Sequence, residues 1–485
     1  MCHPGDPETR QGWVGEQENA PLWRAVARYL ARGCAGLHFP GHGGGAGAPR
    51  ALRRLGRGFL ACDLTELPGL DDLHRPREAI AAAQRLAASL FGAEATFFLV
   101  NGSTAGLQAL MLGLLRAGDR IVLPRHSHRA VVAGLILSGA APVFVDDEPV
   151  PGFGIPAGPS AGAVRAALGT GARAVLLVHP NYYGIAGEIS PLAAAARAAA
   201  AALWVDEAHG AHLPFAGSLS PALAQGADAS VQSLHKMGGA LTQASLLHLK
   251  DAAGLERVAS ALRLLQTSSP SYLLLLSLDL ARRELALRGR VLFARATARA
   301  EAARRALRRV PGITVLEEAH LPPGYRLDPL RLVVNWRGTG LSGYAAAARL
   351  RRLRVQVEMA DAAHTVAVVG PGTPGEAVRR FVAAVREVAR GARGRGEEVA
   401  LLPPRGPLVM LPREAWLAAR ERVPLGQAAG RVAAETVAVS PPGTPLLIPG
   451  EKITPEGASY LEAACARGWP LTGMAADGTL EVVRE

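Results

Sequence analysis

Short apolar runs alternate with longer stretches in which apolar residues recur at helical spacing between about residues 77 and 233. Strands are expected at 96–100, 120–123, 142–145, 172–178, 202–205 and 230–233, and helices at 81–91, 105–115, 130–138 and 191–201. Strands and helices in alternation are typical of βαβ units around a parallel sheet. The pattern therefore predicts an α/β domain with a mainly parallel sheet that ends near residue 233.

The segments on either side have different patterns. Residues 1–60 are rich in Gly, Pro and Arg around one helical stretch at 21–32, which predicts an arm and not a domain. After the sheet we expect helices at 271–287, 291–308, 343–352 and 376–390, with strands at 313–316 and 331–335. We predict four parts: an arm (1–60), a large domain (61–290), a small α+β domain (291–395) and a C-terminal domain (396–485), with a linker at 391–398.

Composition narrows the class of protein. The chain has 485 residues, 49% of them hydrophobic, which is enough for several buried cores. No apolar run reaches the roughly 18 to 20 residues that a membrane span needs, and the first residues lack the features of a signal peptide. Four scattered cysteines show no metal or redox spacing. We therefore expect a cytoplasmic protein with reduced thiols that does not bind a membrane.

The charge of +12 comes mainly from arginines that are spread through many helices. No basic tail interleaved with aromatic residues accompanies it, so we do not expect nucleic-acid binding. The only lysines are Lys236, Lys250 and Lys452. A lysine in so arginine-rich a chain is a candidate for chemistry that arginine cannot perform, because only an amine forms a Schiff base.

The first chemical motif is a strand that runs through a small polar turn into a helix. The turn contains Gly102, Ser103 and Thr104. Amides at the N-terminus of a helix, with hydroxyls beside them, favour a phosphate group. Ser and Thr also cap helices for structural reasons alone, so the motif leaves both interpretations open.

The second motif places Asp206 at the carboxyl end of an apolar strand, where ligands of open α/β sheets bind. A carboxylate there can pair with a protonated pyridine nitrogen and keep the ring able to accept electrons. Glu207, His209 and His212 follow closely, so a metal site is an alternative, although we expect no metal because no second ligand cluster has a recognised spacing. A capping Asp with packed histidines is the structural alternative.

The third motif contains Ser233, His235 and Lys236, about 30 residues after Asp206. Burial near a cationic ring would lower the pKa of a lysine amine and favour the neutral nucleophile. The Ser and His side chains are further candidates for phosphate binding. Each motif alone is common, but the order of phosphate turn, strand-end Asp and Lys is much more specific.

With these motifs the chain resembles the Orn/Lys/Arg decarboxylases, which are fold-type I enzymes that use pyridoxal 5'-phosphate (PLP), and especially their short bacterial form. The resemblance covers roughly residues 30–480. It is carried by segments 39–42, 63–74, 100–104, 124–129, 206–209, 233–236, 266–272, 441–445 and 449–451. Two positions depart from the usual pattern. Gly43 stands where the family has lysine, which weakens any role for the arm. Arg129 also replaces a usual lysine, a change consistent with the low lysine content of the chain.

The resemblance implies roles at the matched positions. Lys236 would form the Schiff base with PLP, Asp206 would pair with the pyridine nitrogen, His128 would stack on the ring, and His209 would lie beside the ring oxygen or the substrate. Groups around the phosphate would come from Gly102, Ser103, Thr104, Ser233 and His235, with Ser269 contributed by a second subunit. We therefore expect at least a homodimer.

The resemblance also implies the reaction, a decarboxylation of a basic amino acid. The short members suggest L-arginine, with agmatine and carbon dioxide as products and polyamine biosynthesis as the context; lysine and ornithine are alternatives. Carboxylates would bind the distal cation of the substrate. His209 and Lys236 are the candidates for the proton donor to Cα. The candidate carboxylates are Glu66, Asp71, Asp72, Glu358, Asp361 and Glu451.

Two other functions are compatible with parts of the pattern. A PLP aminotransferase would share Lys236 and Asp206 and would bind the α-carboxylate with an arginine such as Arg331 or Arg337, but the motif at 266–272 and the C-terminal motifs argue against it. A homologue that has lost catalysis is disfavoured because the lysine, aspartate and histidine positions are all occupied.

Overall fold

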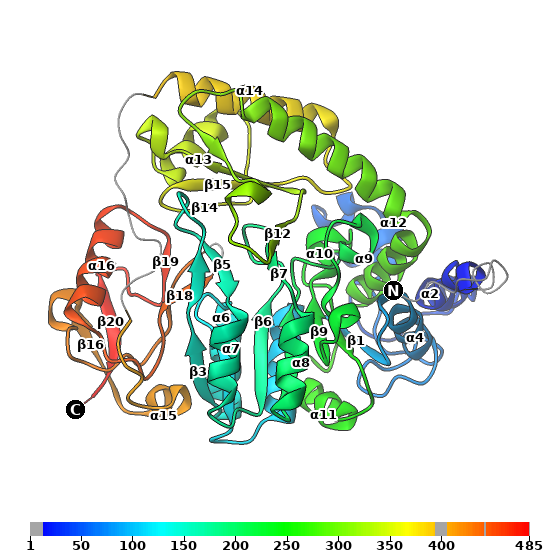
Figure 1. The fold of residues 1–485 in the computed structure, drawn as a ribbon. Coiled ribbons are helices and arrows are strands. Elements are labelled where there is room, and N and C mark those ends of the chain that lie inside the picture. Colours follow the sequence, from blue (N-terminus) through cyan, green and yellow to red (C-terminus); the bar gives the residue numbers. More distant parts are fainter. Residues whose placement is uncertain (1–12, 393–404, 441–442, 485) are drawn as a thin grey trace. The chain divides into compact units, whose positions relative to one another are not determined.

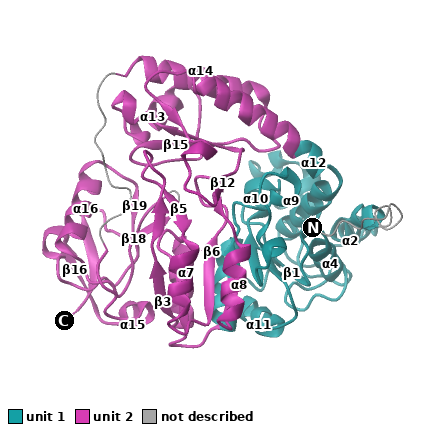
Figure 2. Ribbon diagram, viewed as in Figure 1, with its two compact units in different colours: residues 1–114, 204–292 teal, residues 115–203, 293–485 magenta. Residues whose placement is uncertain are grey.

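The computed structural model describes residues 13–392, 405–440 and 443–484. Most of the linker predicted at 391–398, together with Cys2 and the prolines at 441 and 442, lies outside these ranges. The chain forms two compact units, which Figure 2 colours separately. The first contains residues 1–114 and 204–292, and the second contains residues 115–203 and 293–485. Figure 1 labels their elements.

The strands of the first unit lie in the order β1-β10-β9-β8. Strand β8 is parallel to β9, whereas β10 runs antiparallel to both β9 and β1. The carboxyl ends of β8 and β9 therefore point the same way, and Asp206 lies opposite Val231. The strands are β1 (Ala95–Leu99), β8 (Ala202–Asp206), β9 (Ala229–Gln232) and β10 (Ser245–Leu249).

Helices surround these strands within the same unit (Figure 1). Helices α5 and α11 pack so closely that a Cβ at Gly113 would lie 3.0 Å from the carbonyl oxygen of Arg257. A side chain at position 113 would push the two helices apart. The helical elements are α2 (Pro21–Ala31), η1 (Leu52–Leu55), α3 (Arg57–Ala61), α4 (Ala79–Phe91), α5 (Gly102–Leu114), α9 (Leu213–Ala216), η2 (Ala222–Gln225), α10 (Leu234–Met237) and α11 (Leu255–Leu265).

Two predicted features of this region are wrong. The sheet does not end near residue 233, because β10 follows and inserts between β9 and β1. The two helices predicted at 271–287 and 291–308 are one helix, α12 (Tyr272–Leu307). Gly289 lies between the two predicted helices and allows close packing, since a Cβ there would lie 2.9 Å from the Phe215 ring.

The N-terminal segment is anchored to α12. Asp279 and Arg282 form a fully buried ion pair with 2.7 Å between Oδ1 and Nη2. The Asp279 carboxylate accepts the amide of Leu22, and Arg282 donates to the carbonyl oxygens of Gln17 and Asn19. A buried ion pair is tolerated when further hydrogen bonds satisfy its remaining groups. These two side chains therefore fix where α2 begins.

In the second unit the strands that continue the α/β pattern lie in the order β6-β2-β3, and β2 is parallel to both neighbours. The predicted α/β class with a mainly parallel sheet is confirmed. The elements of this segment are β2 (Arg120–Pro124), α6 (Arg129–Ser138), β3 (Ala141–Val145), β4 (Asp147–Pro149), β5 (Pro156–Pro159), α7 (Ala161–Leu168), β6 (Ala174–Val178), β7 (Ile185–Gly187) and α8 (Ser190–Ala198).

An antiparallel sheet in the order β11-β13-β15-β14 follows in the second unit. It packs with α13 and α14, in agreement with the predicted α+β character. The elements are β11 (Thr314–Val315), η3 (Glu318–His320), β12 (Tyr325–Leu327), β13 (Arg331–Asn335), η4 (Arg337–Thr339), α13 (Gly343–Arg352), β14 (Met359–Ala360), β15 (His364–Val368) and α14 (Gly375–Arg390).

The last part of the chain has its own hydrophobic core, which includes Val423, Leu446 and Leu461. Two small antiparallel sheets, β16-β20 and β18-β17-β19, enclose it with α16. The elements are α15 (Pro412–Leu417), β16 (Arg420–Pro424), η5 (Leu425–Gln427), β17 (Val437–Val439), β18 (Thr444–Leu447), α16 (Pro455–Ala466), β19 (Leu471–Thr472) and β20 (Thr479–Val483).

Candidate active site

Asp206 ends β8 and is 5% exposed. One carboxylate oxygen accepts the amide of Ala208 at 3.1 Å, which turns the chain away from the strand. The carboxylate therefore lies at the strand end where the sequence predicted it. Its burial gives it the low-dielectric setting in which a charge partner matters most.

Lys236 lies in the one-turn helix α10, directly after β9. Its amine is 3.0 Å from Nε2 of His209, which is half-buried in the loop after β8. Because β8 and β9 are parallel neighbours, their two following loops meet at one end of the sheet. The structure thus brings together Lys236 and His209. Lys236 is exposed, so its amine can meet a carbonyl compound.

Several residues predicted to bind the phosphate also lie close together within the first unit. Ser233 Oγ donates to Ser103 Oγ at 3.0 Å, and Gly102 begins the 13-residue helix α5 with a left-handed φ of 75°. Thr104 is exposed on the first turn of that helix. His235 is anchored by Nδ1, 3.2 Å from the carbonyl oxygen of Ala244.

This donor set fits PLP. It offers an accessible amine at Lys236, a buried carboxylate at Asp206 and two hydroxyls at the N-terminus of a helix, where a phosphate is favoured. Ser269 is different, because it is exposed and its amide donates to Thr267 Oγ1 at 3.1 Å. Its predicted place in the site of a second subunit stays a prediction.

His128 belongs to the second unit, where it caps α6. Its Nδ1 accepts the amide of Ala130 at 3.1 Å. This bond fixes the imidazole at the start of the helix and makes Nδ1 the acceptor nitrogen. Stacking of the ring on a cofactor stays a prediction.

Most of the carboxylates considered for substrate recognition make hydrogen bonds within the protein. Asp71 accepts the amides of Ile80 and Ala81 and so caps α4. Asp361 is bonded to Tyr183 and His364. Hydrogen bonds from neighbouring groups reach Glu66, Asp71, Asp72, Asp361 and Glu451. A role in reading the substrate stays a prediction for all six candidates.

The arginines that an aminotransferase would need are also committed within the second unit. Arg331 is 1% exposed in β13 and lies 3.8 Å from the carboxylate of Asp328. Arg337 donates to the carbonyl oxygens of Gly152 and Phe153. These contacts give both guanidinium groups structural tasks and offer no support to the aminotransferase alternative.

A buried polar network behind Asp206 was missed by the sequence reasoning. Glu207 is fully buried and accepts hydrogen bonds from Ser230 Oγ at 2.7 Å, Gln232 Nε2 at 2.8 Å and the amide of Ala222 at 2.8 Å. Burial raises the pKa of Glu207 to about 7, and these hydrogen bonds offset only part of that effect. Glu207 therefore ties β8 to β9, the strands that carry Asp206 and Lys236. Two polar residues at alternate positions, Ser230 and Gln232, in a buried strand were the available signal.

Gln266 opens the motif at 266–272 and is mostly buried. Its side-chain oxygen accepts the amide of Val100 at 2.7 Å, and its Nε2 donates to the carbonyl oxygen of Phe98 at 3.4 Å. His74 reaches the same motif with 2.9 Å between Nε2 and the carbonyl oxygen of Thr267. The family-like motifs at 63–74, 100–104 and 266–272 therefore lie together in the first unit.

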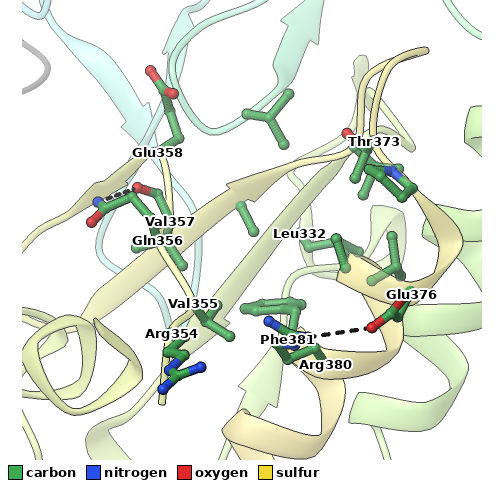
Figure 3. Close-up of a pocket in the computed structure, with 16 residues that line it drawn as sticks. Leu332, Arg354, Val355, Gln356, Val357, Glu358, Thr373, Glu376, Arg380 and Phe381 are labelled. Carbon is green, nitrogen blue, oxygen red and sulfur yellow. Dashed lines mark hydrogen bonds and ion pairs between the residues drawn. The ribbon is translucent and has the colours of Figure 1, made fainter. Parts of the chain in front are cut away.

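A hollow of about 530 Å³ lies in the second unit beside β13, β15 and α14 (Figure 3). Glu358 and Arg354 line it, as does Arg380, whose guanidinium is 3.3 Å from Glu376. Of the described residues around it, none belongs to the predicted cofactor site. The lining therefore gives no link to the predicted chemistry beyond Glu358.

Similarity to known proteins covers almost the whole chain. Residues 20–322 match the Orn/Lys/Arg decarboxylase major domain, and residues 403–477 match the C-terminal domain of the same family. The chain belongs to the Orn/Lys/Arg decarboxylase family. An arginine decarboxylase of Bacillus subtilis (strain 168) is 35% identical over 480 residues, which cover 96% of this chain and 98% of that protein. An arginine decarboxylase of Halalkalibacterium halodurans is 35% identical over 97% of this chain and 99% of its own length. The chain is thus an amino-acid decarboxylase, as predicted.

Solved structures give the fold. Lysine decarboxylase A from Pseudomonas aeruginosa superposes with a TM-score of 0.83 at 20% identity and covers 98% of this decarboxylase and 82% of its own chain. An alanine–glyoxylate aminotransferase from Nostoc sp. has a TM-score of 0.55 at 19% identity over 69% of this chain and 92% of its own. The fold-type I prediction is confirmed.

The described residues of this decarboxylase contain neither a candidate membrane span nor a candidate metal site. None of their helices is both long and apolar enough to cross a membrane. Among the same residues, no group of three or more His, Cys, Asp or Glu side chains could hold a metal ion.

Proposed function

We propose that this family member is an arginine decarboxylase that uses PLP and converts L-arginine to agmatine and carbon dioxide. The observation that carries the proposal is the 3.0 Å contact between the Lys236 amine in α10 and His209, which follows the buried Asp206 at the end of β8. Four relatives named arginine decarboxylase, 33–35% identical to this chain, support arginine as the substrate.

When bound, PLP supplies an aldehyde that forms a Schiff base with an amine and a ring that accepts the electrons of the broken Cα–carboxylate bond. In the proposal Lys236 binds the aldehyde, and Asp206 holds a proton on the pyridine nitrogen. Ser103, Ser233 and the amides that begin α5 bind the phosphate, with Gly102, Thr104 and His235 around them. His128 covers one face of the ring.

The protein accelerates the reaction chiefly by orientation and by a fixed electrostatic field. Residues around the site would orient the substrate so that the electrons of its Cα–carboxylate bond could pass to the ring. A proton must then reach Cα. Lys236 Nζ and His209 Nε2, 3.0 Å apart, form a proton-sharing pair suited to that step.

The test is to incubate the purified protein and PLP with arginine, lysine or ornithine in separate reactions and to measure carbon dioxide and the amine formed. Agmatine and carbon dioxide from arginine, both abolished in Lys236→Ala, are expected. Formation of cadaverine from lysine, or of putrescine from ornithine, would change the assigned substrate but not the assigned reaction. A keto acid without carbon dioxide would indicate an aminotransferase, and no carbon dioxide from any of the three would contradict the decarboxylase assignment.

Several finer expectations belong to the same proposal. We propose a homodimer or larger homo-oligomer in which Ser269 of one subunit completes the site of the other, a cytoplasmic location, and a role in polyamine biosynthesis. The four-part division at residues 60, 290 and 395 also stays a prediction. Light scattering of the purified protein tests the oligomer, and the PLP dissociation constant of Ser269→Ala, compared with the wild type, tests the role of Ser269.

A further inference from the structure

Arg125 is a buried arginine at the start of the segment 125–129 that leads into α6 and contains His128. Its Nη2 lies 2.8 Å from Oε2 of Glu451, and the same guanidinium donates to the carbonyl oxygens of Pro445 and Leu446 at 3.3 Å. Three acceptors from residues 445–451 thus converge on one side chain. A planar guanidinium is suited to holding several acceptors in fixed directions.

Glu451 is equally constrained. It is 3% exposed, and its Oε2 also accepts the amide of Ile448 at 3.0 Å. Leu446 and Leu447 on the same segment belong to the hydrophobic core of the C-terminal part. The segment that contacts Arg125 is therefore fixed to a packed core and cannot follow Arg125 freely.

A second contact reaches His128 itself. The amide of Arg129 donates to the carbonyl oxygen of Gly443 at 3.0 Å. Gly443 has a φ of 97°, and a Cβ there would lie 3.0 Å from Nε2 and 3.2 Å from Cδ2 of His128. Only glycine lets the backbone pass so close to the imidazole.

The buried ion pair between Arg125 and Glu451 is better suited to fixing the position of the backbone than to stabilising the fold. Burial lowers the pKa of Arg125 and raises that of Glu451, which means that desolvation opposes both charges. A buried ion pair often stabilises a fold no better than apolar side chains of the same size, and fixing one arrangement is its better supported use. The arrangement fixed here is the backbone on both sides of His128.

We propose that Glu451, Arg125 and Gly443 are positioning residues through which residues 443–451 hold the His128 imidazole in place for the cofactor. The inference rests on the proposed role of His128 as the residue that covers the PLP ring. None of the three touches the reacting atoms in this proposal; they act through His128.

The first test uses Glu451→Gln and Gly443→Ala, with Glu421→Gln as the matched control, because Glu421 pairs with Arg431 in the same C-terminal part. Hydrogen exchange of the Arg129 and Ala130 amides in the protein without PLP is expected to quicken about 10-fold in the first two variants only. The PLP dissociation constant is expected to rise and the visible circular dichroism of the bound cofactor to weaken, with kcat falling about 10- to 100-fold and KM changing little. Gly443→Ala keeps the test open if loss of the buried charge prevents folding.

The second test combines Glu451→Gln with His128→Ala. If Glu451 acts through His128, the double variant loses no more than His128→Ala alone, because the interaction is already absent. Additive losses in the cycle, or unchanged exchange and circular dichroism in both folded variants, would overturn the inference. If the wild-type protein with PLP shows neither a visible cofactor band nor carbon dioxide release, the proposed function fails instead, whatever the exchange data show.

Discussion

The Lys236 amine and Nε2 of His209 lie 3.0 Å apart although 27 residues separate them in the chain. The contact exists because β8 and β9 are parallel neighbours, so the segment after β8, which holds His209, and α10 after β9, which holds Lys236, meet at one end of the sheet. It joins the lysine proposed for the Schiff base to an imidazole, a group that can donate or accept a proton.

Lys236→Ala is expected to remove the visible absorbance band of lysine-bound PLP and to lower kcat by at least about 10³-fold, because it removes the amine that binds the aldehyde in the proposal. Absorbance and carbon dioxide release measure the two effects. Lys250→Ala is the matched control, since Lys250 is an exposed lysine that donates to the carbonyl oxygen of Gly92. A wild-type band in Lys236→Ala would refute the assignment.

Ser233→Ala is expected to weaken PLP binding about 10-fold or more, because it removes a hydroxyl that would bond a charged phosphate. Titration of the protein with PLP, followed by absorbance, gives the dissociation constant. Ser138→Ala serves as control because it also deletes a buried hydroxyl, one that bonds to Gly134 in α6. Equal affinities in all three proteins would show that Ser233 does not contact the phosphate.

Glu207 makes stability depend on pH. Burial raises its pKa from 4.5 to about 7, so between these values the folded chain holds a proton that the unfolded chain has lost. The free energy of unfolding therefore falls as the pH rises through this window and levels off above pH 7, by about 3 kcal/mol in total. Urea unfolding at about pH 5 and about pH 8 should show this fall in the wild type and a smaller one in Glu207→Gln. Identical pH dependence in the two proteins would contradict the prediction.

Gly289→Ala is expected to destabilise the protein by about 1–3 kcal/mol, because the added methyl meets the Phe215 ring at 2.9 Å. In an exposed helix the same change would be stabilising. The matched background is Phe215→Ala, in which Gly289→Ala should cost nothing or raise the melting temperature. A loss of the same size in both backgrounds would mean that the ring is not the obstacle.

The sequence was a good guide to elements and to local motifs. The strand expected at 331–335 and the helix expected at 343–352 have the predicted bounds, because their apolar spacing is regular and their ends are marked by turn residues. Asp206 lies at the end of β8 as expected, since a buried strand and the acidic residue after it are contiguous in sequence.

Contacts between residues far apart in the chain could not be predicted from the sequence. β10 has a short apolar sequence with no alternation to mark it, and its place between β1 and β9 depends on partners far along the chain. Gly289 resembles a helix breaker until Phe215 is seen beside it. Glu451 was a candidate for substrate recognition, and only the structure shows that it pairs with Arg125, 326 residues earlier in the chain.

The hydrogen bonds of Gln266 do more than join the motifs at 100–104 and 266–272. β1 is the last strand in its sheet order, and edge strands with apolar sequences such as Ala95–Leu99 can recruit a strand from another molecule. The Gln266 side chain bonds the carbonyl oxygen of Phe98 and the amide of Val100, two groups that an incoming strand would need. One side-chain amide thus occupies two of the backbone groups through which a further strand would pair with β1.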